Sequence, residues 1–375
     1  MLKKVMLFSI CVIMIGAACI IPVIGKRETP APKPPVGVTQ TVPGVPAAIT
    51  PSLPSAPSAT PGQPIPTLPP TSTKAAPTAA PTFPPSSTPV PTKDLQPPPC
   101  TKKGETWVSP ADGATLVCVP EGSFLMGSNA YDADDDAKPA HTVALDAYWI
   151  DQAEVTNSQF EAFVNATGYL TEAQKGVTSY YYNQARKAWE KESGASWKMP
   201  KGPGSNLAGR ADFPVVLMSW QDADTYCRSV GRRLPTEAEW EKAARGTDAR
   251  KYPWGDEFPN CTLANFNKTG TTGGTDYCVG DVLKVGSLPR GSSPYGAWDM
   301  VGNVSEWVAD WYSSTYYKSS PVQNPKGPSS GRGHIYRGGN WSFGSVHMLV
   351  YRRMYLEMNV IYDFMGFRCA VSAGK

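Results

Sequence analysis

A 72-residue segment near the start of this chain excludes a fold that uses the whole sequence. Residues 28–99 contain 23 prolines, five charged residues and one aromatic residue, Phe83. A segment of this composition cannot bury enough apolar surface to offset the entropy lost on ordering. We therefore expect a disordered linker with a polyproline-II bias. A single globular block then occupies residues 100–375, which hold all 11 Trp and all 17 Tyr.

The residues before this linker predict export from the cytoplasm. Lys3 and Lys4 precede an apolar run over residues 5–25, which suits either a membrane-spanning helix or a secretory signal. Cys19 follows small residues, as in a bacterial lipoprotein signal. We interpret residues 1–27 as an uncleaved anchor, a lipoprotein signal or a cleaved signal, and favour anchoring over release. All three interpretations place the globular block outside the cytoplasmic membrane.

Charge and histidine content argue against two kinds of function. Residues 100–375 carry 28 basic and 30 acidic residues, without the basic excess that nucleic-acid binding needs. The chain has three histidines, which makes a multi-histidine metal centre a poor interpretation, and no Cys/His spacing typical of zinc. We expect no nucleic-acid partner, and membrane contact only through the N-terminus.

Six cysteines follow the apolar run, and an even number in an exported chain predicts disulfides. Many pairings are possible in principle. Proximity in the sequence favours Cys100–Cys118 and Cys261–Cys278, which leaves Cys227 to pair with Cys369.

Local sequence patterns predict short elements in the globular block. Three helices are expected where a Ser or Thr precedes a Gln, Asp or Glu by three residues, at Thr156, Ser219 and Thr236. Glycines 168, 231 and 246 end them. Strands are expected at 114–119, 122–126 and 141–150.

Two further segments of the block are predicted to be loops. Residues 131–138 contain four Asp without the spacing of an EF-hand, so we expect a solvated acidic loop. Residues 170–212 look irregular and are rich in Tyr and Trp. Those aromatic side chains either line a binding cleft or pack a large loop onto the core.

Residues 231–246, with the sequence GRRLPTEAEWEKAARG, closely resemble a motif of the formylglycine-generating enzyme, or sulfatase-modifying factor, family. Other segments on both sides of this motif fit the same family and occur in the family's order. They are residues 119–127, 141–157, 252–255, 295–307, 337–341 and 366–369. The resemblance covers about residues 105–372. It implies one irregular, loop-rich α+β domain related to C-type lectins.

Enzymes of that family oxidise a cysteine in an unfolded sulfatase segment to formylglycine, with copper(I) held by two cysteine thiolates. The resemblance places Phe343 and Met348 at those two positions, and no cysteine lies between Cys278 and Cys369. We therefore expect no catalytic residues, no copper and no formylglycine-generating activity. His347 beside Met348 is an alternative copper site that we consider weak, since such surface pairs seldom bind metal.

The resemblance also implies structural calcium, which prefers hard oxygen ligands. The ligands implied for one site are the side chains of Asp299 and Glu306 and the backbone carbonyls of Gly302 and Val304. Those implied for a second site are Asn265, the carbonyl of Phe266, and either Asp276 or Asp281. The alternative for Glu306 is a salt bridge to an arginine. Cys227 and Cys369 match the family's long-range disulfide.

Two classes of function remain. The first is an anchored extracytoplasmic module that keeps the fold without the chemistry, and that binds or helps to mature a protein, peptide or glycan. The second is a metal-dependent oxidoreductase of the same family with a non-standard site. We favour binding, because few ligands are left to build a redox centre. Metal content would distinguish the two, since copper indicates an enzyme and calcium alone a module.

Overall fold

The computed structural model describes residues 96–183, 186–269, 275–358 and 360–374, all within one compact unit. The predicted anchor at 1–27, the candidate lipidation site Cys19 and nearly all of the predicted linker lie outside these residues. Across the described ranges, none of the helices combines the length and the apolar character needed to cross a bilayer.

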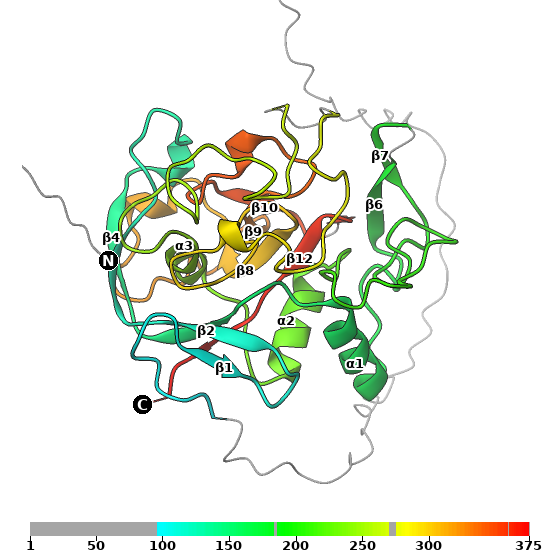
Figure 1. Ribbon diagram of the computed structural model, residues 1–375, viewed down its shortest axis with the longest axis horizontal. Helices are drawn as coiled ribbons and strands as arrows, with labels where there is room; N and C mark the ends of the chain where they lie inside the picture. Colours follow the sequence, from blue (N-terminus) through cyan, green and yellow to red (C-terminus); the bar gives the residue numbers. More distant parts are fainter. Residues whose placement is uncertain (1–95, 184–185, 270–274, 359, 375) are drawn as a thin grey trace, which may run out of the picture. The chain divides into compact units, whose positions relative to one another are not determined.

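The fold is a mixed α+β arrangement of short elements joined by long loops (Figure 1). The described helices are α1 (Asn157–Thr167), α2 (Trp220–Ser229) and α3 (Glu237–Arg245). The described strands are β1 (Thr106–Val108), β2 (Thr115–Val119), β3 (Gly122–Met126), β4 (His141–Leu145), β5 (Tyr148–Asp151), β6 (Thr178–Asn183), β7 (Ala188–Lys191), β8 (Ser305–Trp311), β9 (His334–Arg337), β10 (Met354–Leu356), β11 (Val360–Tyr362), β12 (Met365–Phe367) and β13 (Ala370–Ser372).

These strands form small sheets. One has the order β1-β2-β5-β13, and a second, near the middle of Figure 1, has the order β10-β9-β8-β12. β11, β6 and β7 form a third sheet, whose strands β6 and β7 lie on the same side of Figure 1 as α1, and β3 pairs with β4. Pairing is antiparallel except between β12 and β8 and between β11 and β6. The last strands of the chain thus complete three sheets begun much earlier.

The three predicted helices begin where the capping pattern places them. Each has a full capping box, in which the N-cap hydroxyl and the side chain three residues later bond each other's backbone N–H, at Thr156, Ser219 and Thr236. Gly168 and Gly246 cap α1 and α3 with positive φ, whereas the C-cap of α2 is Val230 and Gly231 follows it. The helix boundaries are therefore determined by local sequence.

The strand predicted at 141–150 is wrong as one element. The chain breaks at Asp146, so that β4 pairs with β3 whereas β5 joins β2 and β13. Asn324, 178 residues away, accepts a hydrogen bond from the Asp146 backbone N–H and donates one to its carboxylate. This contact stabilises the bend at Asp146 between β4 and β5. Because the partner is distant in the sequence, no local pattern predicts the bend.

The two predicted loops are also more ordered than expected. Residues 170–212 contain the β6–β7 hairpin. In the acidic loop, Asp132 pairs with Lys251, and Asp136 accepts a hydrogen bond from the Tyr312 hydroxyl. The loop is therefore fastened to the domain and is not simply solvated.

Buried ion pairs hold α3 in place, and they explain much of the 231–246 motif. The Arg337 guanidinium, fully buried at the end of β9, donates to both Glu237 and Glu241 at 2.9 and 2.6 Å. Arg353 also pairs with Glu237, and Arg245 pairs with Glu241. Buried charges persist only when paired and hydrogen-bonded. Removing any one of these side chains would leave an oppositely charged group buried with one of its partners missing.

Candidate functional site

The segment that the resemblance matches to the family's catalytic region follows β9 (His334–Arg337) directly. It begins with Gly338 and Gly339, both with positive φ, 91° and 63°. A Cβ atom on Gly339 would lie 2.7 Å from the carbonyl oxygen of His347, so a larger residue would block the fold of this segment. The same close approach packs the side chain of Met348 against the glycine turn, where it is fully buried.

Phe343 and Met348 occupy the positions that the resemblance assigns to the copper-binding cysteines. The ring centroid of Phe343 lies 5.2 Å from that of Phe364 and 4.8 Å from that of His347. Phe343 packs against both large core clusters, and Met348 belongs to one of them. The two positions therefore hold an aromatic ring and a buried thioether where thiolates would be required.

Phe343 is part of a larger group of rings, which we call the aromatic wall. Its members are Tyr182, Trp189, Tyr277, Trp341, Phe343, Tyr362 and Phe364. Trp189, in β7, lies 5.2 Å from Tyr182, 5.5 Å from Tyr362 and 5.0 Å from Phe364 between centroids. Four members remain partly exposed: Trp189, Tyr277, Phe343 and Tyr362. Of the two roles predicted for the aromatic residues of 170–212, packing onto the core is present, since Trp197 is fully buried and Trp189 packs against the core. A binding cleft stays a prediction.

A cation lies at one edge of the aromatic wall. The Lys201 ammonium is 5.2 Å from the Trp341 ring centroid, 2.8 Å from an oxygen of Asp363 and 3.4 Å from one of Asp281. Burial opposes its charge, but the two carboxylates together raise the pKa of Lys201. Lys201 and Asp363 are 162 residues apart, so sequence reasoning had no local signal for this group.

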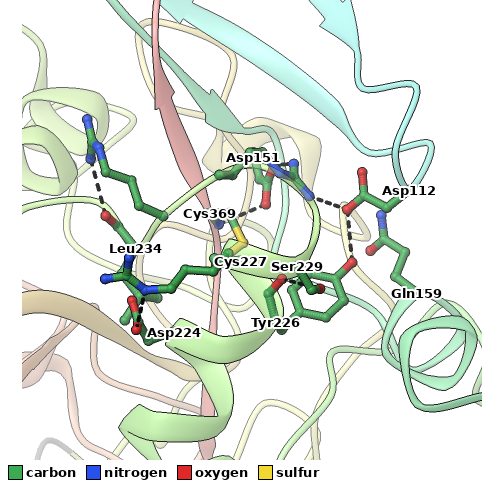
Figure 2. Close-up of a disulfide and its surroundings, with 12 residues drawn as sticks. Asp112, Asp151, Gln159, Asp224, Tyr226, Cys227, Ser229, Leu234 and Cys369 are labelled. Atoms are coloured by element: carbon green, nitrogen blue, oxygen red, sulfur yellow. Dashed lines mark hydrogen bonds and ion pairs between the residues drawn. A yellow bond between two sulfur atoms is a disulfide. The ribbon is translucent and has the colours of Figure 1, made fainter. Parts of the chain in front are cut away.

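All three predicted disulfides are present, Cys100–Cys118, Cys227–Cys369 and Cys261–Cys278. Figure 2 shows the long-range bridge beside a buried acidic network. Asp151 accepts a hydrogen bond from the Cys369 backbone N–H at 2.8 Å, and Arg232 joins Asp151 to Asp112. No described cysteine of residues 100–374 is left with a free thiol.

The residues implied for the first calcium site lie where β8 begins. Glu306 is within β8 rather than in an irregular loop, and it is fully buried. Arg368 donates to both of its carboxylate oxygens at 2.7 Å, and the Trp240 indole N–H donates to one of them at 2.8 Å. The salt bridge considered as the alternative for Glu306 is therefore formed. The calcium assignment itself stays a prediction.

The same turn brings the two implied sites together. Gly302 has φ 82°, and a Cβ there would lie 2.6 Å from the carbonyl oxygen of Asn265. Asn303 donates its backbone N–H to that carbonyl. Val304 is buried beside the turn. The side-chain oxygen of Asn265 is buried without a hydrogen-bond partner among the described residues, which suits a metal ligand.

The remaining residues implied for the second site are engaged in other contacts. The Phe266 carbonyl accepts a hydrogen bond from the Cys278 N–H. Of the two candidate acids, Asp281 pairs with Lys201 and Arg210, and Asp276 pairs with Lys268 at the surface. Asn265 is the member of this set with a buried side-chain oxygen that has no hydrogen-bond partner among the described residues.

A loop-rich α+β domain with this glycine turn, this long-range disulfide and this α3 motif defines the sulfatase-modifying-factor class. A family model for the sulfatase-modifying factor enzyme 1-like domain matches residues 104–373. The chain belongs to this family.

Relatives of known activity support the assignment. The formylglycine-generating enzyme of Streptomyces coelicolor is 37% identical over 285 residues, which cover 68% of this chain and 89% of that protein. The inactive C-alpha-formylglycine-generating enzyme 2 of Mus musculus is 35% identical over 286 residues, covering 71% and 88%. Similarity thus extends to both active and inactive members.

Solved structures agree on the fold. The structure of PvdO from Pseudomonas aeruginosa has a TM-score of 0.56 at 24% identity and covers 72% of this chain and 98% of that one. Treponema denticola variable protein 1 has a TM-score of 0.51 at 22% identity, with the same coverage. At such identities the likeness concerns the fold alone.

Proposed function

We propose that this chain is an extracytoplasmic binding or accessory module of the sulfatase-modifying factor family, held at the membrane by its N-terminus and without copper oxidase chemistry. The observation that carries the proposal is the pair Phe343 and Met348, which replaces the two copper-binding thiolates. Copper(I) needs soft ligands such as thiolates, and every described cysteine is in a disulfide. The mouse relative supports the proposal, because its name marks a family member as inactive.

The aromatic wall is the surface on which we expect a ligand to bind. Partly exposed Trp and Tyr rings provide large, rigid contact area at small entropic cost, and their polar edges can hydrogen-bond. Lys201 adds a partly exposed charged group at the border, held in place by the buried Asp363. A glycan or an extended peptide segment outside the cell offers the hydroxyl groups, apolar faces or aromatic side chains that suit such a surface.

The first experiment tests for the family's chemistry. The full-length protein is incubated with a sulfatase-motif peptide, copper and oxygen, and the peptide is analysed by mass spectrometry beside the Streptomyces coelicolor enzyme as positive control. We expect no aldehyde product above the protein-free control. Aldehyde formation by the unmodified chain would overturn the proposal.

A matched variant tests whether the two replaced positions are the right ones. Phe343→Cys combined with Met348→Cys restores two thiols at the assigned positions, and we expect that variant to bind copper(I) where the unmodified chain does not. Single substitutions serve as controls, since one thiolate holds copper weakly. Equal copper binding by all four proteins would show that the positions are misassigned.

No observation favours the oxidoreductase alternative. The Met348 side chain packs on Gly339, whereas the His347 ring contacts Phe343. Burial also lowers the pKa of His347 to about 4, which leaves a neutral ring without supplying a second soft ligand.

Location outside the cytoplasm is part of the same proposal. Three disulfides in a single domain are typical of oxidising compartments. Membrane fractionation of the full-length chain and of Cys19→Ser separates the three interpretations of the N-terminus. Loss of membrane association in Cys19→Ser indicates a lipid anchor, and retention indicates a helix. Release of the unmodified chain from the membrane fraction into the medium or periplasm indicates a cleaved signal. A protein that fractionates with the cytoplasm would contradict the proposal.

A further inference from the structure

The last residues of the proline-rich linker are fastened to the domain through their backbone. The carbonyl of Pro98 accepts hydrogen bonds from the Trp149 indole N–H at 2.8 Å and from the Gly374 backbone N–H at 3.1 Å. A Cβ atom on Gly374 would lie 2.3 Å from the carbonyl oxygen of Pro97, so the two segments approach closely. Cys100 is bonded to β2 through a disulfide. These contacts, which we call the linker clamp, make the linker enter the domain at one fixed place.

A cavity of about 470 Å³ lies beside the linker clamp. Ser372, two residues before Gly374 in the chain, lines this cavity. Ala147 lines it as well, and its carbonyl accepts a hydrogen bond from the Ala373 N–H. Two residues of chain span at most about 7 Å. The linker residues that precede Pro98 therefore start within reach of the cavity.

The lining of the cavity combines apolar side chains with one rigid aromatic ring. Leu145 and Leu234 are among the apolar residues, and Trp220 supplies the ring. The Trp220 indole N–H donates to the Val308 carbonyl at 2.8 Å, and the ring is stacked 3.8 Å from that of His334 between centroids. Part of the Trp220 side chain remains exposed. A ring held in this way offers apolar contact area to an aliphatic side chain.

Two charged groups that line the cavity lack a partner of opposite charge. Asp146 accepts hydrogen bonds from the side-chain amides of Gln323 and Asn324, which carry no charge, and Lys326 is exposed. Neither group forms an ion pair with any residue that the structure describes. The other charged side chains of the lining are paired with each other, Asp224 with Arg228 and Arg233 with Glu239. The cavity therefore offers one negative and one positive charge to an occupant.

The linker sequence carries the complementary groups directly before the clamp. Lys93 and Asp94 are adjacent, and residues 75–99 contain no other charged residue. Leu95 follows them. A polyproline-II chain rises about 3.1 Å per residue and has three residues per turn. Asp94 is then about 12 Å from Pro98 along the chain, and Leu95 is one turn from it. These three residues can therefore reach the cavity.

We propose that residues 93–95 of the chain's own linker dock in this cavity. Asp94 pairs with Lys326, and Lys93 pairs with Asp146. The leucine that follows covers the exposed part of the tryptophan ring. Each contact is weak by itself, as exposed ion pairs are. Covalent attachment beside the cavity gives the segment a high effective concentration, so that weak contacts suffice.

Docking of this segment has two consequences for the protein. The segment closes the cavity toward solvent, and the free part of the linker ends at residue 92. The domain is then held in one orientation on its linker. The cavity shares no lining residue with the aromatic wall, so this inference goes beyond the proposed binding function and does not depend on it.

The test is cleavage of the full-length protein by a lysine-specific endoproteinase, with the fragments followed by mass spectrometry. Cleavage after Lys74, in the same linker, is the internal reference for cleavage after Lys93. We expect cleavage after Lys93 to be about tenfold faster in Lys326→Glu than in the unmodified chain, because cleavage tracks the population of undocked segment. Lys326→Glu leaves the linker sequence unchanged, so a difference in rate comes from the cavity.

Two comparisons make the outcome decisive. Lys318→Glu makes the same charge change at another exposed lysine and should leave the rate of cleavage after Lys93 unchanged. Asp94→Arg combined with Lys326→Glu should be cleaved there more slowly than Asp94→Arg alone, because opposite charges face each other again.

Three results overturn the proposal. One is an equal rate of cleavage after Lys93 in the unmodified chain and in Lys326→Glu. Another is an equal rate in Asp94→Arg with and without Lys326→Glu. The third is a rate that changes with protein concentration, which would place the linker of a second copy in the cavity.

Discussion

The guanidinium of Arg368 and the carboxylate of Glu306 form a bidentate pair, with both N–O distances at 2.7 Å and both side chains buried. The pair links the Gly-Phe-Arg-Cys segment near the C-terminus to β8. The remaining donors of Arg368 bind the carbonyls of Asp151, at the end of β5, and of Trp298. Two motifs that are 62 residues apart in the sequence thus form one structural unit.

The first prediction concerns the stability that this pair provides. Arg368→Met should lower the free energy of unfolding by about 3–5 kcal/mol, because it leaves the Glu306 charge buried without a partner. Urea unfolding of both proteins measures the change. Arg186→Met, which breaks an exposed pair with Glu190, is the control and should change stability little. A small change in Arg368→Met would mean that solvent reaches Glu306.

The second prediction concerns pH and Asp310. Burial, and next the charge of Glu237, raises the pKa of Asp310 to about 8, against an ordinary value of 3.8. A raised pKa means that the folded state binds the proton more tightly, so this group lowers stability as pH rises from about 4 to 8. Asp310→Asn removes that loss and keeps an oxygen for the Glu237 N–H, which now donates to Asp310 at 2.8 Å.

The measurement for Asp310 is a comparison of melting temperatures at pH 5 and pH 9. We expect Asp310→Asn to gain on the unmodified chain as pH increases, with the larger advantage at pH 9. Asp248→Asn, at an exposed site paired with Arg250, controls for the loss of one negative charge. An advantage that is the same at both pH values would contradict a raised pKa.

The third prediction compares two disulfides by loop length. Cys227 and Cys369 close a loop of 142 residues, whereas Cys261 and Cys278 close one of 17. The loop-closure model assigns about 4–5 kcal/mol to the longer loop and about 3 kcal/mol to the shorter one. Replacing both cysteines of each bridge by alanine should therefore destabilise more at Cys227 and Cys369. Urea unfolding decides, and the reverse order would indicate residual structure in the unfolded chain.

The fourth prediction places ligand binding at the aromatic wall. The unmodified chain is first screened on a glycan array and a peptide array. Trp189→Ala or Tyr362→Ala should then abolish most binding to the probes that the unmodified chain binds. Trp107→Ala, which removes a partly exposed ring on β1 next to Trp149, is the matched control and should leave binding intact. Binding that survives both wall substitutions but fails in the control would move the site to the β1–β2–β5–β13 sheet.

Local sequence determined much of this protein. Hydroxyl caps with their partners three residues on define the starts of α1, α2 and α3, since a capping box is satisfied within four residues. The even cysteine count and their spacing were enough to predict all three disulfides. The absence of cysteine between Cys278 and Cys369 is likewise a property of the sequence alone. That Phe343 and Met348 stand at the family's copper-binding positions stays a prediction.

Tertiary structure decided what depends on distant partners. Asp146 splits a predicted strand because Asn324 binds it from 178 residues away. The resemblance left Glu306 either as a calcium ligand or as the partner of an arginine, and the fold supplies that arginine by placing Arg368 against both of its oxygens. Glu154 carries no signal in the sequence, and only the fold shows that it is buried with one carboxylate oxygen lacking a hydrogen-bond partner among the described residues. Charge pairing and burial depend on three-dimensional proximity, which motifs and spacing do not specify.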